Sequence, residues 1–173
     1  MKLLIAHDGS SCAKAALHDL KRAGLPREGV ATVVSVADLW LPPMEGPADP
    51  SVSNKLAAAG QRARDRVAQA IEEARAIAGR ACEKLQANLP DWQVHAEACA
   101  GSPGWEIIRK ADVWKADLIV VGSHGRSTLG QTILGSVSQR VVNIEHFLLG
   151  SVSSAVAARA RCSVEVVHPR RAV

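Results

Sequence analysis

The chain has 173 residues, 47% of them hydrophobic, so it is the size of one domain and can build one core. Its apolar runs fall far short of the roughly 20 residues that a membrane-spanning helix needs, and its N-terminus lacks the layout of a signal peptide. We therefore expect a soluble, cytoplasmic protein that does not bind membranes. The net charge of +4 comes from interleaved basic and acidic residues, and aromatic residues are only 3%, so nucleic-acid binding is not expected.

A first β-strand and helix are predicted at the N-terminus. Lys2 to His7 is a strand candidate, and Asp8-Gly9-Ser10-Ser11 follows it as a turn. The aspartate or a serine of this turn can cap a helix from Ala13 to Ala23. Val30 to Val36 is almost continuously apolar, as in strands of parallel sheets that are covered on both faces.

The next segment contains a loop and a long helix. Asp38 to Ser53 carries four prolines, which exclude a regular helix or an inner strand, so we predict a surface loop. Trp40 and Met44 in this loop are candidates for a lid over a site. Asn54 to Asn88 has apolar residues at steps of three and four, which predicts an amphipathic helix whose charged residues face solvent.

Three more strands and a helix are predicted in the second half. Before the predicted helix that ends at Trp114, Ser102 is a candidate N-cap and Pro103 suits the first turn. The strands are Trp92 to Cys99, Asp117 to Val121 and Cys162 to Val167, and the helix is Trp105 to Trp114. Strands that alternate with helices predict an α/β fold with a doubly wound parallel sheet, which binds ligands beyond the carboxyl ends of its strands.

The four cysteines are Cys12, Cys82, Cys99 and Cys162. They form no C-x2-C pair and lie far apart, which argues against a zinc knuckle or a redox motif. Buried thiols are the expectation.

A glycine-rich loop follows the fourth strand with the pattern Gly122-x2-Gly125-x9-Gly135-Ser136. The first two glycines allow positive φ angles and a close approach of the backbone to a ligand. Gly135 and Ser136 would open a helix whose free N–H groups and hydroxyl suit an anion. The alternative is a loop in which the glycines only turn the chain.

This pattern, together with Ile5-Ala6-His7-Asp8-Gly9-Ser10 and Cys162-Ser163-Val164-Glu165-Val166-Val167, resembles the universal stress protein family. The resemblance covers nearly the whole chain, and the three signatures occur in the family's order. It implies one universal stress protein domain over residues 1–173, with a five-stranded parallel sheet in the order 3-2-1-4-5 and helices on both faces. That fold is like the adenine-nucleotide α-hydrolases. It also implies a homodimer through the last strand, Ser163 to Val167.

The resemblance further implies an adenine nucleotide as ligand: ATP, ADP or AMP, with Mg2+ brought by the nucleotide. No catalytic residue and no metal site of the protein's own is expected. The implied binding residues are Ala6, His7, Asp8, Val36, Val121, Gly122, His124, Gly125, Arg126, Gly135, Ser136, Val137 and Ser138.

Several of these residues have a second interpretation. Asp8 would contact the adenine or ribose side, or it only caps a helix. Val36 would pack on the adenine, and it can also be a core valine. His124 would contact a phosphate or lie exposed to solvent, and Arg126 would screen phosphate charge or stay solvated.

One feature departs from the family. Leu134-Gly135-Ser136-Val137-Ser138 recurs as Leu149-Gly150-Ser151-Val152-Ser153. The nine-residue spacing favours the first copy as the phosphate site. If the second copy forms the site instead, with Gly150, Ser151, Val152 and Ser153, then Ser151 to Arg161 is about long enough to cross back over the sheet.

Three functions remain open. The first is a nucleotide-binding module of the stress response, with at most slow ATP hydrolysis and an unidentified protein partner. The second is a dimeric scaffold that binds no nucleotide. The third, a phosphate-transferring enzyme, is disfavoured because Gly130-x4-Gly135-Ser136 lacks the lysine of a Walker A motif.

Overall fold

The structure is a computed structural model that describes residues 1–39, 53–125 and 149–169, without the side chains of residues 53–59. Its elements alternate between strands and helices, as the sequence predicts. They are β1 (Lys2–Ala6), α1 (Ser11–Asp19), a 3-10 turn (Leu20–Arg22), β2 (Gly29–Asp38), α2 (Ser53–Asn88), β3 (Trp92–Gly101), α3 (Pro103–Trp114), β4 (Leu118–Gly122), α4 (Ser151–Arg159) and β5 (Ser163–Val167).

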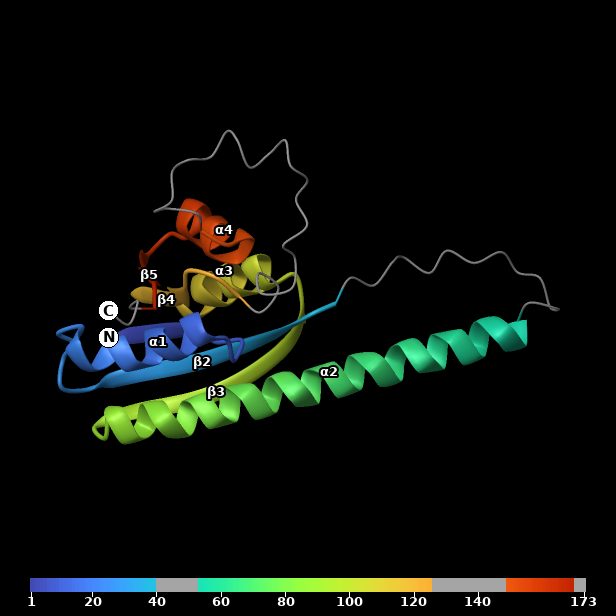
Figure 1. Ribbon diagram of the computed structural model, residues 1–173, viewed down its shortest axis with the longest axis horizontal. Helices are drawn as coiled ribbons and strands as arrows, with labels where there is room; N and C mark the ends of the chain where they lie inside the picture. Colours follow the sequence, from blue (N-terminus) through green and yellow to red (C-terminus); the bar gives the residue numbers. More distant parts are fainter. Residues whose placement is uncertain (40–52, 126–148, 170–173) are drawn as a thin grey trace.

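The five strands form one parallel sheet in the order β3-β2-β1-β4-β5 (Figure 1), so the predicted order is confirmed. β1 lies in the centre and pairs with β2 on one side and β4 on the other. The winding reverses between β1 and β4, so their carboxyl ends border the crevice in which doubly wound sheets bind ligands.

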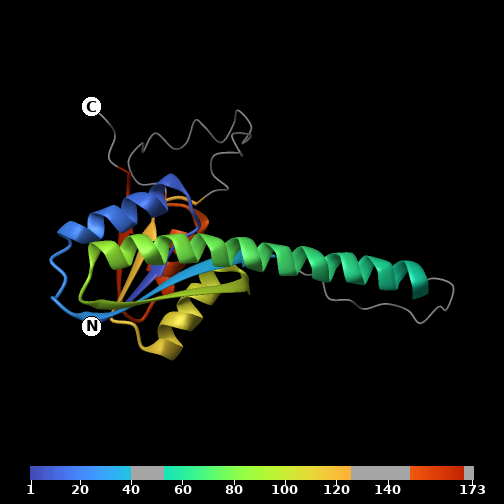
Figure 2. The ribbon, with the colours of Figure 1, turned by 90° about the horizontal axis from the view of Figure 1, so that it is seen from below.

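A core lies on each face of the sheet. On one face α1 and α2 cover the sheet, with Leu17 and Leu85 packed near Ile5. On the other face α3 and α4 cover it, with Ile107 and Val156 packed near Ile119. Figure 2 shows α1 and α2 above the sheet and α3 below it. This two-sided burial explains why the inner strands are almost wholly apolar.

Local signals start and end the shorter helices. Ser10 is the N-cap of α1 and its hydroxyl accepts a hydrogen bond from the Ala13 N–H, which confirms the predicted serine cap. Pro103 is the first residue of α3, as predicted, and Ser102 precedes it. Ser102 is the N-cap residue, as predicted, although its side chain makes no capping hydrogen bond. α3 ends at Trp114, and its C-cap Lys115 adopts a left-handed conformation with φ 58°.

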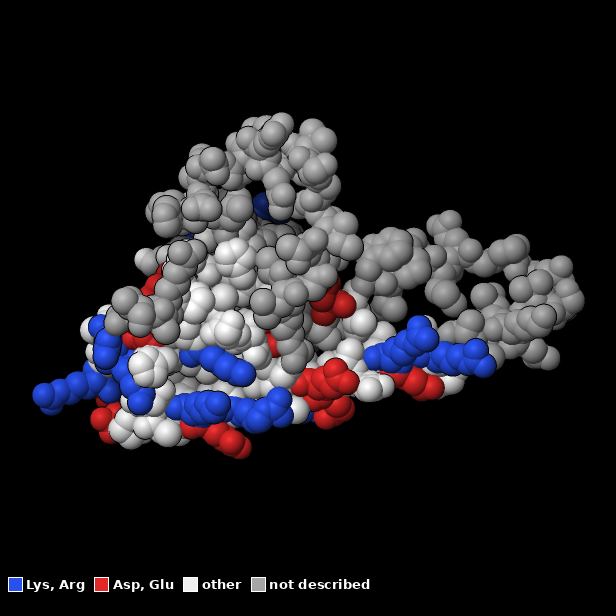
Figure 3. Space-filling model, in the orientation of Figure 1, with Lys and Arg blue, Asp and Glu red and all other residues white. Residues whose placement is uncertain are grey.

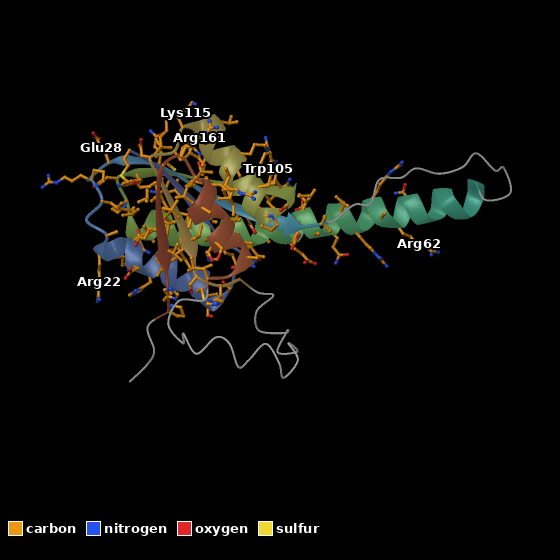
Figure 4. All side chains as sticks on the ribbon, turned by 90° about the horizontal axis from the view of Figure 1, so that it is seen from above. Arg22, Glu28, Arg62, Trp105, Lys115 and Arg161 are labelled. Atoms are coloured by element: carbon orange, nitrogen blue, oxygen red, sulfur yellow. The ribbon has the colours of Figure 1, made fainter. Side chains whose placement is uncertain are left out.

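The 36-residue helix α2 has two different halves. Its C-terminal half packs on the sheet through Ala74, Ile77 and Leu85. Its N-terminal half extends away from the body (Figures 1 and 2), and Figure 4 shows Arg62 far out along it. On the side of α2 that Figure 3 shows, both basic and acidic side chains occur along the helix.

The four cysteines are free, and only Cys12 is buried. The expectation of buried thiols was therefore wrong for Cys82, Cys99 and Cys162, which are half-buried. Partial burial raises the pKa of each of these three thiols. Since the thiolate is the reactive form, the raised pKa disfavours redox chemistry at neutral pH.

Trp40 and Met44, the predicted lid residues, lie outside the described residues. None of the helices in the described ranges combines the length and the apolar character needed to cross a membrane.

Candidate functional site

The carboxyl ends of β1 and β4 lie side by side, with Ala6 in register with Val121. The loop after β1 contains His7, Asp8 and Gly9, and the loop after β4 contains Ser123 and His124. The N-terminus of α4 reaches the same edge through Gly150. These three segments form the candidate site.

Ser123 ties the site together through its backbone. Its N–H donates to the Val167 carbonyl at 2.9 Å, which fixes the loop to the end of β5. Its carbonyl accepts from the Gly150 N–H at 2.7 Å and from the Ser153 hydroxyl at 2.8 Å. The buried Ser123 carbonyl therefore holds the start of α4 against the end of β4.

The two helices that begin at the site differ at their N-termini. In α1 the Ser10 hydroxyl accepts from the Ala13 N–H, and an Asp8 carboxylate oxygen accepts from the Ser10 N–H at 2.9 Å. In α4 the N-cap is Gly150, which offers no side chain, and the first intrahelical bond runs from the Ser154 N–H to the Gly150 carbonyl at 2.9 Å. The N–H groups that precede this bond at the start of α4 suit an anion.

Gly122 owes its role to packing. A Cβ added there would lie 2.8 Å from the backbone of Cys12 and Ala13, so only glycine lets β4 approach α1 so closely. The expectation of positive φ angles at Gly122 and Gly125 was wrong, because among the described glycines only Gly9, Gly24 and Gly101 adopt them. Glycine is needed in this part of the loop because there is no space for a side chain. The sequence pattern cannot distinguish this reason from a need for a positive φ angle.

Gly125 and Gly150 also leave little space for a side chain. A Cβ at Gly125 would lie 3.0 Å from a carboxylate oxygen of Asp8, and one at Gly150 would lie 3.2 Å from the Ser123 carbonyl oxygen. Both glycines let neighbouring segments of the site come close, so larger side chains would reach into it.

The other predicted residues that the structure describes surround this edge of the sheet. Val121 is buried in the core on the α3 and α4 face, and Ala6 and Val36 are half-buried against the same core. His7 is 6% exposed and its Nδ1 accepts from the Gly9 N–H at 3.2 Å. His124 is half-buried, with Nδ1 at 3.2 Å from the Ser123 hydroxyl.

The second copy of the repeated segment forms the start of α4, with Gly150 as the N-cap and Ser151, Val152 and Ser153 in the first turn. The spacing argument favoured the first copy, but in the structure the helix that leads to β5 begins in the second. The physical reason is length. The chain must return along the sheet before β5 begins, and the nine residues of α4 are about as long as the five residues of β5. Arg126, Gly135, Ser136, Val137 and Ser138 lie outside the described residues.

Sequence reasoning missed the residues that organise the site. Ser123 carries the backbone contacts to α4 and β5, and the Ser10 hydroxyl donates to the His124 carbonyl at 3.4 Å. His168 follows β5, and its ring centroid lies 6.4 Å from that of His124 in an edge-on arrangement. A local rule predicted the serine cap of α1, but no local pattern marks these contacts, because they join segments far apart in the sequence.

Within the ranges that the structure describes, no three His, Cys, Asp or Glu side chains form a group that could hold a metal ion.

A five-stranded parallel sheet with a glycine-lined loop at its winding reversal defines a class of small α/β proteins that bind ligands at the strand ends. Comparison with known proteins places this chain in one family of that class. The model of the universal stress protein family matches residues 1–144, and the chain belongs to this family. That match ends before the second copy of the repeated segment and before β5.

Individual relatives agree with this assignment. The chain is 32% identical over 152 residues to Universal stress protein MJ0531 of Methanocaldococcus jannaschii, with 84% of this chain and 77% of the relative covered. The solved structure of hypothetical protein MJ0577 has a TM-score of 0.70 at 21% identity, covering 99% of this chain and 97% of that one. A universal stress protein in complex with cAMP has a TM-score of 0.54 at 20% identity, covering 97% and 96% of the two chains.

Proposed function

We propose that this universal stress protein is an adenine-nucleotide-binding module whose pocket lies at the carboxyl ends of β1 and β4. One observation carries the proposal: the Ser123 carbonyl holds the N-terminus of α4, which has no side-chain cap, against the glycine-lined loop after β4. Small residues on both sides leave the backbone N–H groups accessible to an anionic group.

The second copy of the repeated segment is the phosphate-binding copy in this proposal. Ser151, Val152 and Ser153 supply helix N–H groups and Ser151 also supplies a hydroxyl, while the Gly150 N–H and the Ser153 hydroxyl hold the helix to the Ser123 carbonyl. Gly125 leaves space between this helix end and the loop after β1. A phosphate gains from these N–H groups and from the positive end of the helix dipole. Mg2+ accompanies the nucleotide and keeps most of its own waters.

Asp8, Ala6 and Val36 lie toward the adenine and ribose side of this pocket. Asp8 already accepts the Ser10 N–H with one carboxylate oxygen, which orients the carboxylate beside Gly125. The similar fold of a universal stress protein in complex with cAMP supports an adenine-containing ligand.

The protein acts by binding in this proposal, in the cytoplasm and during a stress response, and it recruits a protein partner when loaded. Catalysis is not part of the role, because the Nδ1 of His124 lies by a serine hydroxyl, which is a weaker orienting group for a general base than a carboxylate. Dimerisation through β5 completes the proposal, since β5 is an edge strand of the sheet.

Titration calorimetry with ATP and MgCl2 tests the binding, with Gly125→Val as the diagnostic variant. The Cβ of a valine there would lie 3.0 Å from a carboxylate oxygen of Asp8, and the rest of its side chain would fill the space between the two loops. We expect the variant to bind at least about tenfold more weakly, which corresponds to the loss of one charge-assisted hydrogen bond.

Gly79→Val is the matched control, because a Cβ at Gly79 meets no atom within 4 Å. Circular dichroism should show both variants folded. Wild-type protein that binds no nucleotide at millimolar concentration would contradict the proposal and favour a scaffold. Unchanged affinity in Gly125→Val would show that the pocket lies elsewhere.

A further inference from the structure

His168 directly follows β5, and the sequence alone gives it no role. In the structure its ring lies edge-on to the ring of His124, with 6.4 Å between centroids and 62° between planes. Both histidines are placed by Ser123. His124 is its chain neighbour, and the Ser123 N–H donates to the carbonyl of Val167, the residue before His168.

The same serine holds the start of α4 through the Gly150 N–H. The His124 backbone is also near that helix end, because a Cβ added to Gly150 would lie 3.4 Å from the His124 Cα. Two imidazoles and one helix N-terminus thus gather around a single peptide unit. All three are hydrogen-bond donors for an anion once the imidazoles are protonated.

We propose that His168 is a further binding residue for the phosphate end of the nucleotide, acting with His124 as an imidazole pair that takes up protons when the phosphates bind. This inference rests on the proposed nucleotide function. Two neighbouring imidazolium groups repel each other, and an anion between them offsets the repulsion, so binding and protonation favour one another. Histidine changes its charge between pH 5 and 8, which puts this linkage near physiological pH.

The described elements that meet at this edge carry few other charged or titratable residues, and His7 directly after β1 is one of them. The β1–α1 loop contributes the Asp8 carboxylate, and the first turn of α1 contributes Lys14. On β5 the nearest charged residue in sequence is Glu165, which interacts with Asp19 of α1. The first turn of α4 contains only serines and a valine.

The test is calorimetric titration with ADP at pH 6.0 and pH 8.0 on wild type, His168→Gln and His95→Gln. Glutamine keeps a hydrogen-bond donor but cannot take up a proton. His95 is an exposed histidine of β3, at the opposite edge of the sheet, and is the matched control. The protonation of ADP itself is common to all three proteins and cancels in the comparison.

In wild type and His95→Gln we expect ADP affinity to rise about tenfold from pH 8.0 to pH 6.0, the size of one charge-assisted hydrogen bond gained. In His168→Gln the rise should shrink to about threefold or less on the same reasoning, with fewer protons taken up in buffers of different ionisation enthalpy. Adenosine, which lacks phosphate, should show no such dependence. An equal rise in His168→Gln and wild type would overturn this inference alone, whereas no ADP binding at either pH would overturn the proposed function as well.

Discussion

Gly122 shows how a single residue can serve packing while it resembles part of a ligand loop. A Cβ there would lie 2.8 Å from backbone atoms of α1, which cannot move as a flexible side chain can. We expect Gly122→Ala to lower the free energy of unfolding by about 1–3 kcal/mol, the usual cost of overpacking. Urea denaturation measures this.

The matched substitution is Gly79→Ala, in open space within α2. It should leave stability unchanged or raise it by up to about 1 kcal/mol, because alanine favours a helix over glycine. Equal stability of both alanine variants would show that β4 and α1 are not so closely packed. Gly122→Val needs still more of this missing space, so it should destabilise the fold more than Gly122→Ala does.

The residues of the site were predictable only where a local rule applies. The Ser10 cap follows from a turn before a helix, and the structure confirms it. The Ser123 carbonyl receives its bonds from Gly150 and Ser153, and no spacing in the sequence encodes that contact. The same limit hid His168, whose neighbour His124 lies on another strand end.

At the scale of elements, α2 combines a buried half and a projecting half in one continuous helix. Leu85 is fully buried and packs in the core beneath α1 and α2, whereas Val67 lies half-buried on the projecting half. We expect Leu85→Ala to cost about 2–5 kcal/mol of unfolding free energy, because it leaves a cavity. Val67→Ala should stay within about 0.5 kcal/mol of wild type, as substitutions outside a core do.

Thermal and chemical denaturation of the two alanine variants measure this difference. A loss at Val67 as large as that at Leu85 would show that the projecting half is packed against something in solution. The periodicity of α2 predicted the whole helix, but it could not show where the body of the protein ends, because the apolar stripe runs along both halves.

The strands and their order were predictable because each apolar run is bounded by a turn and the alternation with helices leaves few topologies. The start of the last helix, α4, could not be predicted in this way. Two copies of one segment satisfy the same local rules, and the copy that begins α4 is the one from which nine residues reach β5.

At the scale of the whole molecule, β5 is an edge strand with one partner, β4. Glu165 occupies its centre, and burial, followed by the charge of Asp19, raises the pKa of this carboxyl. The charged form is therefore the disfavoured one in the folded protein. Because the folded protein binds this proton more tightly than the unfolded chain, the proton stabilises the fold. This stabilisation is complete below the unfolded-state pKa of about 4.3 and is lost as pH rises through the higher folded-state pKa.

Pairing of β5 with its copy in the proposed homodimer would remove more water from Glu165 and bring two carboxylates toward each other. Dimerisation should consequently strengthen as pH falls from 7.5 toward 5, and Glu165→Gln should strengthen it at pH 7.5 and weaken its dependence on pH. Sedimentation velocity over a range of concentrations measures both effects. A wild-type mass of 18.3 kDa at every concentration would contradict the dimer, because an edge strand that pairs must double this mass. A dimer equally strong in wild type and Glu165→Gln at both pH values would place its interface away from β5.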